Sequence, residues 1–347
     1  METASLWPGH EITRVIRGGW QLAPGHTTAG NGASGDAVAD LLATAEAGIN
    51  TFDCADIYTG VEETIGAFRK VYRDKHGAAA LGAIKVHTKF VPDLAALGSL
   101  SRTTVRAAID QSRRRLGMDR LDLVQFHWWD EAVAGWRDAA GWLGGLAADG
   151  AVAGVGGTNF GARHVRQMLA DGVPLKSMQV QYSVLDDRPA REMAALGVPL
   201  LCYGTVAGGF LSDRWLGAPE PAEMENRSLV KYKLIIDDVG GWDVFQSLLA
   251  ALRSVADRHR SDIATVASRW VLGRDGVAAV IVGARNRSHL SRNLALAGLT
   301  LSPEDVAQID RARASLKSLE GDVYDLERDR SSPHGAIMKY NLNKDAA

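Results

Sequence analysis

The stretch Gly48-Ile-Asn-Thr-Phe-Asp53 is a short run of mainly apolar and β-favouring residues that ends in an acid. Similar runs recur along the chain, and each ends in polar residues before a segment with helical spacing. They are Val15–Trp20, Ala83–Lys89, Leu121–His127, Val152–Asn159, Ser177–Gln181, Val198–Tyr203 and Val277–Val282. Strands that alternate with helices predict a parallel sheet covered by helices. Eight such units in a chain of 347 residues favour an α/β fold of the closed (β/α)8 TIM-barrel type over an open sheet.

The segments between these strands carry apolar residues at the spacing of one helix face. The predicted helices are Asp36–Ala47, Thr103–Leu116, Val133–Ala148, Ala162–Ala170, Pro189–Leu196, Trp242–Arg258 and His289–Ala297. Two extra helices are predicted at Asp262–Leu272 and at Ser302–Leu316, where Ser302-Pro-Glu-Asp305 forms a capping-box pattern. We expect one domain over residues 1–347, with a long functional loop at 204–240 and a polar tail at 317–347 lying over the rim.

The composition is that of an ordinary globular protein, with 46% hydrophobic and 23% charged residues. A formal charge of −2 gives no electrostatic reason to bind nucleic acid or an anionic membrane. The chain has no apolar run of the about 18 residues that a spanning helix needs, and its first residues lack a signal-peptide pattern. The only cysteines, Cys54 and Cys202, lie far apart, which fits a reducing cytoplasm.

Polar residues end three of the predicted strands, and these are Asp53, Lys89 and His127. Tyr58 follows Asp53 by five residues, in the next loop. Catalytic groups of such barrels come from the carboxyl ends of different strands, so we expect the four to meet at one rim. A phenol titrates near ~10 when unperturbed, and a nearby ammonium lowers that pKa by favouring the phenolate. A carboxylate can hold the ammonium, and a neutral histidine can orient a carbonyl, so the set predicts proton transfer.

Each of these residues also has a purely structural interpretation. Asp53 could cap the next helix, Lys89 could be solvated, and His127 could be a satisfied core histidine. The joint occurrence of such residues at three strand ends favours the catalytic interpretation over these alternatives.

The stretch Gly48-Ile-Asn-Thr-Phe-Asp-Cys-Ala-Asp-Ile-Tyr-Thr-Gly-Val-Glu-Glu-Thr-Ile-Gly66 resembles the signature of the aldo-keto reductases. Thr88-Lys-Phe90 and Gln125-Phe-His127 resemble the lysine and histidine strands of that family. The resemblance covers nearly the whole chain, although the spacing from Asp53 to Glu62 is one residue longer than in the short form of the signature. It implies a carbonyl–alcohol oxidoreductase that binds a nicotinamide cofactor without a Rossmann domain. It also implies Tyr58 as general acid and base, Lys89 as the residue that lowers its pKa, Asp53 as the partner of Lys89, and His127 beside the substrate carbonyl.

The same resemblance implies the residues that contact the cofactor. Thr158, Asn159 and Gln179 match residues that bind the nicotinamide amide, and Tyr203 matches the aromatic residue that stacks on the ring. Trp20 would lie near the site of hydride transfer. The pyrophosphate loop is matched by Gly204, Thr205, Leu211, Arg214 and Arg227, although the two arginines could equally be solvated loop residues.

The adenosine end of the cofactor is matched by the segment Val282-Gly-Ala-Arg-Asn-Arg-Ser-His-Leu-Ser-Arg-Asn293. The residues implied there are Gly283, Arg285, His289 and Asn293, at a helix N-terminus that favours an anion. Arg285 matches the position beside a 2′-phosphate, so we expect NADP(H), with NAD(H) possible because His289 and Arg292 depart from the common family residues.

The expected substrate contacts are Trp20, Tyr58, His127 and Trp128. The adjacent Trp128 and Trp129 would suit a hydrophobic or cyclic alcohol or a sugar ring, or would pack over the barrel rim.

Two other protein classes were weighed against this one. A Rossmann dehydrogenase is disfavoured because Gly154-Val-Gly-Gly-Thr-Asn159 ends in Asn where the fingerprint needs Gly, and because it lies in mid-chain. The patterns of zinc proteases, P-loop nucleotide hydrolases and serine hydrolases are missing from the sequence, and no metal site is expected. The second class, a cofactor-binding sensor or regulatory subunit of the same fold, stays open because such subunits can keep the four polar residues.

Overall fold

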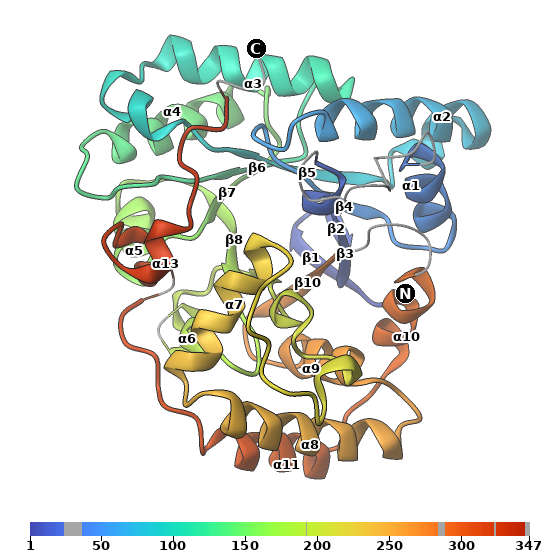
Figure 1. Ribbon diagram of the computed structural model, residues 1–347. Helices are drawn as coiled ribbons and strands as arrows, with labels where there is room; N and C mark the ends of the chain where they lie inside the picture. The colour runs from blue at the N-terminus through green and yellow to red at the C-terminus, as the bar shows by residue number, and fades with distance from the viewer. Residues whose placement is uncertain (24–36, 192, 284–288, 323, 344–347) are drawn as a thin grey trace.

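The structure is a computed structural model, and it describes residues 1–23, 37–191, 193–283, 289–322 and 324–343. Its centre is a closed barrel of eight parallel strands in the order β10-β3-β4-β5-β6-β7-β8-β9 (Figure 1). The predicted barrel is therefore confirmed. The barrel strands are β3 (Val15–Gly18), β4 (Thr51–Asp53), β5 (Lys85–Phe90), β6 (Leu123–Phe126), β7 (Val155–Thr158), β8 (Leu175–Gln181), β9 (Leu200–Tyr203) and β10 (Val277–Gly283).

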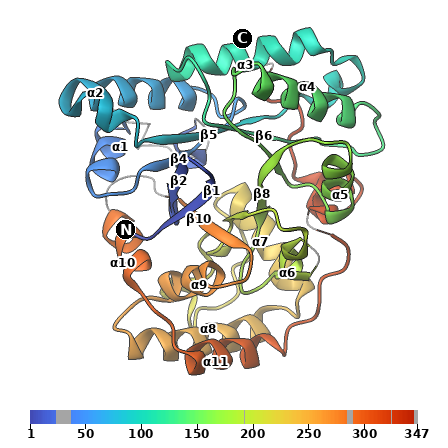
Figure 2. The same cartoon turned by 180° about the vertical axis from the view of Figure 1, so that it is seen from behind.

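A ring of helices surrounds the barrel, as Figures 1 and 2 show from its two ends. Its members are α1 (Ala37–Glu46), α2 (Val61–Leu81), α3 (Arg102–Leu116), α4 (Trp136–Ala148), α5 (Ala162–Ala170), α8 (Trp242–Arg258) and α10 (Leu290–Gly298). The two extra helices are confirmed as α9 (Ile263–Leu272) and α11 (Pro303–Arg313). Ser302 caps α11 through the predicted capping box.

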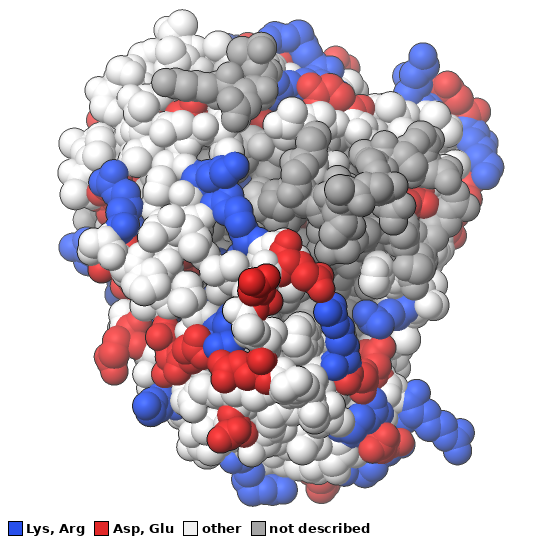
Figure 3. Space-filling view, in the orientation of Figure 1, with Lys and Arg blue, Asp and Glu red and all other residues white. Residues whose placement is uncertain are grey.

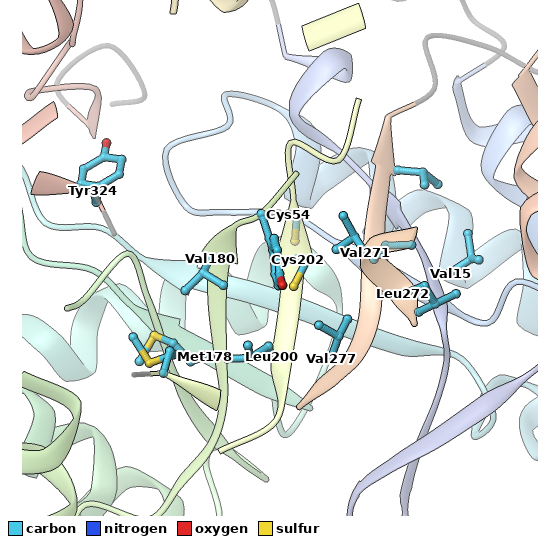
Figure 4. Close-up of a cluster of buried hydrophobic side chains, with 14 of the residues drawn as sticks. Val15, Cys54, Met178, Val180, Leu200, Cys202, Val271, Leu272, Val277 and Tyr324 are labelled. Carbon is cyan, nitrogen blue, oxygen red and sulfur yellow. The ribbon is translucent and has the colours of Figure 1, made fainter. Parts of the chain in front are cut away.

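Two apolar cores hold the barrel. The larger lies between the strands and the helices, where residues from β8, β9, β10 and α9 pack together (Figure 4). Its members there include Val180, Leu200, Cys202, Val271 and Val277. The smaller core fills the amino-terminal end of the barrel interior with Leu6, Ile12, Ile16, Leu123, Leu201, Ala279 and Ile281. The carboxyl end of the interior is left to polar side chains.

Three elements differ from the sequence prediction. Helix α2 had not been predicted, although Val61, Ile65 and Phe68 form its buried face. An antiparallel hairpin of β1 (Thr3–Trp7) and β2 (His10–Thr13) precedes the barrel, and Leu6 and Ile12 from it enter the smaller core. Helix α7 (Arg227–Asp238) lies inside the stretch that was expected to be a loop.

Other boundaries moved by a few residues. Helix α4 begins at Trp136 rather than at Val133. In place of the helix predicted at Pro189–Leu196 the chain forms the short α6 (Arg188–Arg191) and the 3-10 turn η3 (Ala194–Leu196). None of the described helices is long and apolar enough to cross a membrane. Figure 3 shows basic and acidic side chains interspersed among the described residues of the face seen in Figure 1.

Candidate active site

A buried ion pair lies at the carboxyl ends of β4 and β5. Asp53 ends β4, and Lys89 lies one residue before the end of β5. Lys89 Nζ donates to Asp53 Oδ2 at 2.6 Å and to the backbone carbonyl of Cys54 at 2.8 Å. Burial alone would lower the pKa of Lys89, but the Asp53 carboxylate and Tyr58 outweigh it and raise that pKa. Lys89 therefore stays a charged ammonium inside the barrel.

Tyr58 reaches this pair from the loop between β4 and α2. Lys89 Nζ lies 4.9 Å from the centre of its ring. Burial raises the pKa of the Tyr58 hydroxyl, and the Lys89 ammonium opposes that rise without cancelling it. The sequence had led us to expect a lowered pKa; in this structure desolvation of the phenolate is the larger effect. The hydroxyl is therefore protonated at neutral pH, which is the form a general acid needs.

His127 follows β6 and is buried. Its Nδ1 lies 3.2 Å from the carbonyl oxygen of Thr158, and since a carbonyl only accepts, Nδ1 carries the proton. Burial, together with the charge of Arg328, lowers the pKa of His127 to about 3, so the ring is neutral. Its Nε2 is buried and has no hydrogen-bond partner among the described residues. In this tautomer Nε2 offers a lone pair, which an alcohol hydroxyl can satisfy and a carbonyl oxygen cannot.

Two glutamines complete the polar layer around Asp53. Gln179 of β8 donates from Nε2 to Asp53 Oδ1 at 2.7 Å, and Gln125 of β6 donates to the same oxygen at 3.1 Å. Gln179 also contacts Gln125 Oε1 at 3.1 Å. Gln179, which the sequence suggested for cofactor binding, is thus turned into the barrel. Gln125 is a member of this layer that we had not singled out for a role.

The aromatic residues of the rim separate into two groups. Trp20 begins the 3-10 turn η1 (Trp20–Leu22), is 37% exposed and meets the Tyr58 ring edge-on at 4.8 Å. Trp128 is fully buried, and its indole N–H donates to the carbonyl of Val133. That burial differs from the substrate contact we expected of Trp128. Its neighbour Trp129 lies edge-on to His127 at 4.4 Å, so the second tryptophan, not the first, adjoins the site.

The residues expected around a nicotinamide ring lie at the ends of β7 and β9, the two strands that flank β8 in the barrel. Thr158 ends β7 and Tyr203 ends β9. Asn159 has a left-handed backbone (φ 61°), and its Oδ1 accepts a hydrogen bond from the Tyr203 hydroxyl at 2.9 Å. Lys231 of α7 lies 5.7 Å from the Tyr203 ring. An amide and a planar ring at adjacent positions suit a planar carboxamide ligand, so these residues fit a nicotinamide.

The loop after β9 is covered by helix α7. At Gly204 (φ 74°) an added Cβ would lie 2.1 Å from the Tyr232 hydroxyl. The missing side chain therefore allows α7 to pack closely against this loop. The Thr205 hydroxyl is buried against Ser268 Oγ at 2.8 Å. The Leu211 side chain is fully buried in the core. Any pyrophosphate contact from these three residues would therefore come from the main chain.

The two arginines expected near the pyrophosphate have partners within the protein. Arg214 is exposed and forms an ion pair with Glu225 at 3.0 Å. Arg227 begins α7 and donates to the carbonyl of Ile337 in the tail. Binding of a phosphate by either residue would require these contacts to be exchanged.

The adenosine-side residues are described only in part. Gly283 ends β10, where the Gln21 amide lies within 2.3 Å of a would-be Cβ. Asn293 is buried on α10, and His289 is the residue that precedes this helix. Arg285 lies outside the described residues.

The tail lies along one side of the carboxyl end of the barrel, and in Figure 1 it is the red segment that passes through α13 beside α5. Tyr324 lies edge-on to the His127 ring at 5.5 Å. Glu327 of α12 (Asp325–Arg328) forms a buried ion pair with Lys231 at 2.8 Å, and Arg328 donates to the carbonyl of Asn159. The tail continues through α13 (Pro333–Ala336), and the Asn343 side chain then donates to the carbonyl of Val91 after β5. The predicted position over the rim is therefore observed.

Neither Lys231 nor Glu327 stood out in the sequence. They lie far apart in the chain and belong to no motif, so only the fold brings them together. Among the described residues no group of three His, Cys, Asp or Glu side chains could hold a metal ion.

Comparison with known proteins agrees with this architecture. The profile of the Aldo/keto reductase family matches residues 14–314, which is most of the chain. The protein belongs to the aldo/keto reductase family. The enzymes of this family are oxidoreductases that use a nicotinamide cofactor.

The curated relatives include reductases and a flagellar radial spoke protein. NADH-specific methylglyoxal reductase of Escherichia coli (strain K12) is 25% identical over 317 residues, which cover 85% of this chain and 92% of that one. Flagellar radial spoke protein 5 of Chlamydomonas reinhardtii is 29% identical over 256 residues, or 62% of this chain and 48% of that protein. Among solved structures, the glycerol dehydrogenase of Gluconobacter oxydans superposes with a TM-score of 0.73 at 20% identity, covering 90% of this chain and 95% of that one. This last likeness shows the fold alone.

Proposed function

We propose that the protein interconverts an aldehyde or ketone and the corresponding alcohol, with Tyr58 as the general acid in reduction and the general base in oxidation. The observation that carries this proposal is the Lys89 ammonium, held by Asp53 at 2.6 Å and placed 4.9 Å from the Tyr58 ring. A buried cation beside a phenol stabilises the phenolate that remains when the proton leaves.

A nicotinamide cofactor supplies or accepts the hydride when it is bound. Thr158, Asn159 and the ring of Tyr203 would hold its nicotinamide end. In reduction the Tyr58 hydroxyl donates its proton to the substrate oxygen, and Lys89 stabilises the charge left on Tyr58. The neutral His127 then accepts a hydrogen bond from the new alcohol hydroxyl at Nε2. That contact favours the alcohol without protonating it.

The proposed substrate is a small carbonyl compound bounded by aromatic side chains. Trp20 and Tyr324 border the reactive residues, at 4.8 Å from the Tyr58 ring and 5.5 Å from the His127 ring. Flat apolar walls suit a substrate with an apolar or ring-shaped body.

The proposed cofactor is NADP(H), on the match of Arg285 to the position beside a 2′-phosphate. Arg285→Ala should weaken NADP binding and leave NAD binding nearly unchanged, as measured by quenching of protein fluorescence. Equal losses for both cofactors would show that Arg285 does not contact the 2′-phosphate.

A turnover screen tests the function directly. The protein is mixed with NADPH or NADH and a panel of aldehydes and ketones, and the loss of cofactor absorbance is followed. Turnover with at least one carbonyl compound is expected. The alternative is a cofactor-binding regulatory subunit, for which the similarity to a radial spoke protein is the specific observation. Tight cofactor binding without turnover across the whole panel would favour that alternative.

A further inference from the structure

The carboxylate of Asp53 has more hydrogen-bond donors than its pairing with Lys89 requires. Oδ2 accepts from Lys89, while Oδ1 accepts from both Gln125 and Gln179. All four side chains are buried, and Gln125 is 0% exposed. In such a position every donor matters, because a carboxylate oxygen without a partner costs free energy that water cannot restore.

The amide orientation of Gln125 is set by its two neighbours. A carboxylate accepts only, so the group of Gln125 that faces Asp53 at 3.1 Å is the NH2. The Oε1 that results on the other side accepts from Gln179 Nε2 at 3.1 Å. Gln125 lies opposite Lys89 in the register of β5 and β6 and two residues before His127. It is therefore fixed beside the ion pair by the strand and by its hydrogen bonds.

The two glutamines differ in the second ligand that their amides are expected to bind. The resemblance assigns Gln179 to binding of the nicotinamide carboxamide. In the present structure the side-chain NH2 of Gln179 donates to Asp53 and to Gln125 instead. If Gln179 turned toward a bound cofactor, Asp53 Oδ1 would keep only the hydrogen bond from Gln125. Without that bond the carboxylate would either draw Lys89 away with both oxygens or take its proton. Both changes weaken the positive charge beside Tyr58.

We propose that Gln125 is a positioning residue for proton transfer by Tyr58, because its amide holds Asp53 in the orientation that keeps Lys89 charged beside the phenol. This rests on the proposed role of Tyr58 as acid and base. Gln125 itself touches neither the reacting atoms nor the proton that moves; it acts through Asp53 and Lys89.

The test uses two variants and a matched control. Gln125→Leu keeps the size of the side chain and removes the amide. Gln125→Glu keeps the shape, and its carboxyl can donate to Asp53 only while it is protonated. Ser177→Ala is the control, because Ser177 is a buried polar residue of β8 whose hydroxyl has no hydrogen-bond partner among the described residues.

The first readout needs no turnover. Ultraviolet absorbance of tyrosinate is titrated in each protein saturated with NADP⁺ and compared with the same protein carrying Tyr58→Phe, so that the difference reports Tyr58. We expect Gln125→Leu to raise the pKa of Tyr58 by about 1, since part of the opposing effect of Lys89 is lost. Ser177→Ala should leave the difference curve in place. An unchanged Tyr58 curve in Gln125→Leu would overturn the proposal.

The second readout is alcohol oxidation as a function of pH. Gln125→Leu should show about a tenfold lower kcat at each pH, with the affinity for the cofactor unchanged within about twofold. Gln125→Glu should lose activity as the pH rises past the pKa of the introduced carboxyl, because the ionised carboxyl can no longer donate to Asp53. This variant also tests the proposal if Gln125→Leu does not fold. A pH profile of Gln125→Glu parallel to that of the original protein would overturn it. If the original protein turns over no substrate, the proposed function fails, while the tyrosinate titration still decides the role of Gln125.

Discussion

Removing the Lys89 ammonium should destabilise the protein far more than removing a surface lysine with an equally short ion pair. Lys89→Met leaves Asp53 charged and buried at 4% exposure. Breaking a buried pair from one side costs ~3–5 kcal/mol. We expect the lower end of that range, about 3 kcal/mol, because the amides of Gln125 and Gln179 still donate to Asp53.

The surface pair Lys75–Glu46 provides the matched control. Its Nζ–Oε1 distance is also 2.6 Å, but its side chains are 54% and 33% exposed. Lys75→Met should therefore cost no more than about 1 kcal/mol. The distance between ammonium and carboxylate is equal in the two pairs, so a larger loss in Lys89→Met reports the burial of that ammonium, including its second hydrogen bond to the carbonyl of Cys54.

The assay is equilibrium unfolding in urea, with the variants Lys89→Met, Asp53→Asn and the double variant. The double variant removes both charges and leaves neither one buried alone. It should be more stable than the sum of the single losses indicates, by roughly 2 kcal/mol. Two results would refute the account of a buried, mutually dependent pair. One is a loss of unfolding free energy in the double variant that equals the sum of the two single losses within about 0.5 kcal/mol. The other is a loss in Lys89→Met that is no larger than the loss in Lys75→Met.

Two further predictions concern the floor of the barrel. Burial lowers the pKa of His10 to about 4, so the unfolded chain takes up this proton first as pH falls; the contribution of His10 to stability should therefore decline from about pH 6.5 and level off near pH 4, by up to about 3 kcal/mol. His10→Gln should flatten this decline in thermal unfolding, whereas the exposed His76→Gln should not, and an equally steep decline in His10→Gln would contradict the assignment. Gly154→Ala should cost about 1–3 kcal/mol in urea unfolding because the new Cβ would lie 2.6 Å from the Trp7 ring; Gly141→Ala, which meets nothing within 4 Å on α4, should be neutral or stabilising, and equal effects of the two would contradict the packing.

The barrel could be predicted from the sequence because each unit repeats the same local pattern. Apolar runs such as Leu121–His127 are buried on both faces, and the helices between them show one apolar face. The boundaries of the strands could not be predicted to the residue. The last residues are polar both in a strand that continues its backbone pairing and in one that has already ended. Helix α7 was missed because the segment that contains it begins with prolines and charges, which mark a loop up to Asn226, where its amino-terminal cap lies.

The residues at strand ends could be predicted, whereas the contacts between distant segments could not. The positions of Asp53 and Lys89 follow from their strands, and their proximity follows from the parallel pairing of β4 with β5, in which Asp53 lies opposite His87, two residues before Lys89. The ion pair between Lys231 and Glu327 joins a helix to the tail and has no local signal.

The sequence also could not show which of the two consecutive tryptophans, Trp128 or Trp129, adjoins the site. The indole of Trp128 donates to Val133 within the core, and its neighbour Trp129 meets His127. The orientation of each tryptophan depends on the path of the loop that follows β6, which the sequence does not show.

Replacing Tyr58 by phenylalanine tests the central claim most directly. The variant loses only a hydroxyl, and the hydrogen bonds of Lys89 to Asp53 and to the carbonyl of Cys54 do not involve it. With a carbonyl substrate found in the turnover screen, we predict that kcat falls by roughly 10²–10⁴-fold while the affinity for NADPH changes little. Turnover by Tyr58→Phe at the rate of the original protein would contradict the assignment of Tyr58 as the proton donor.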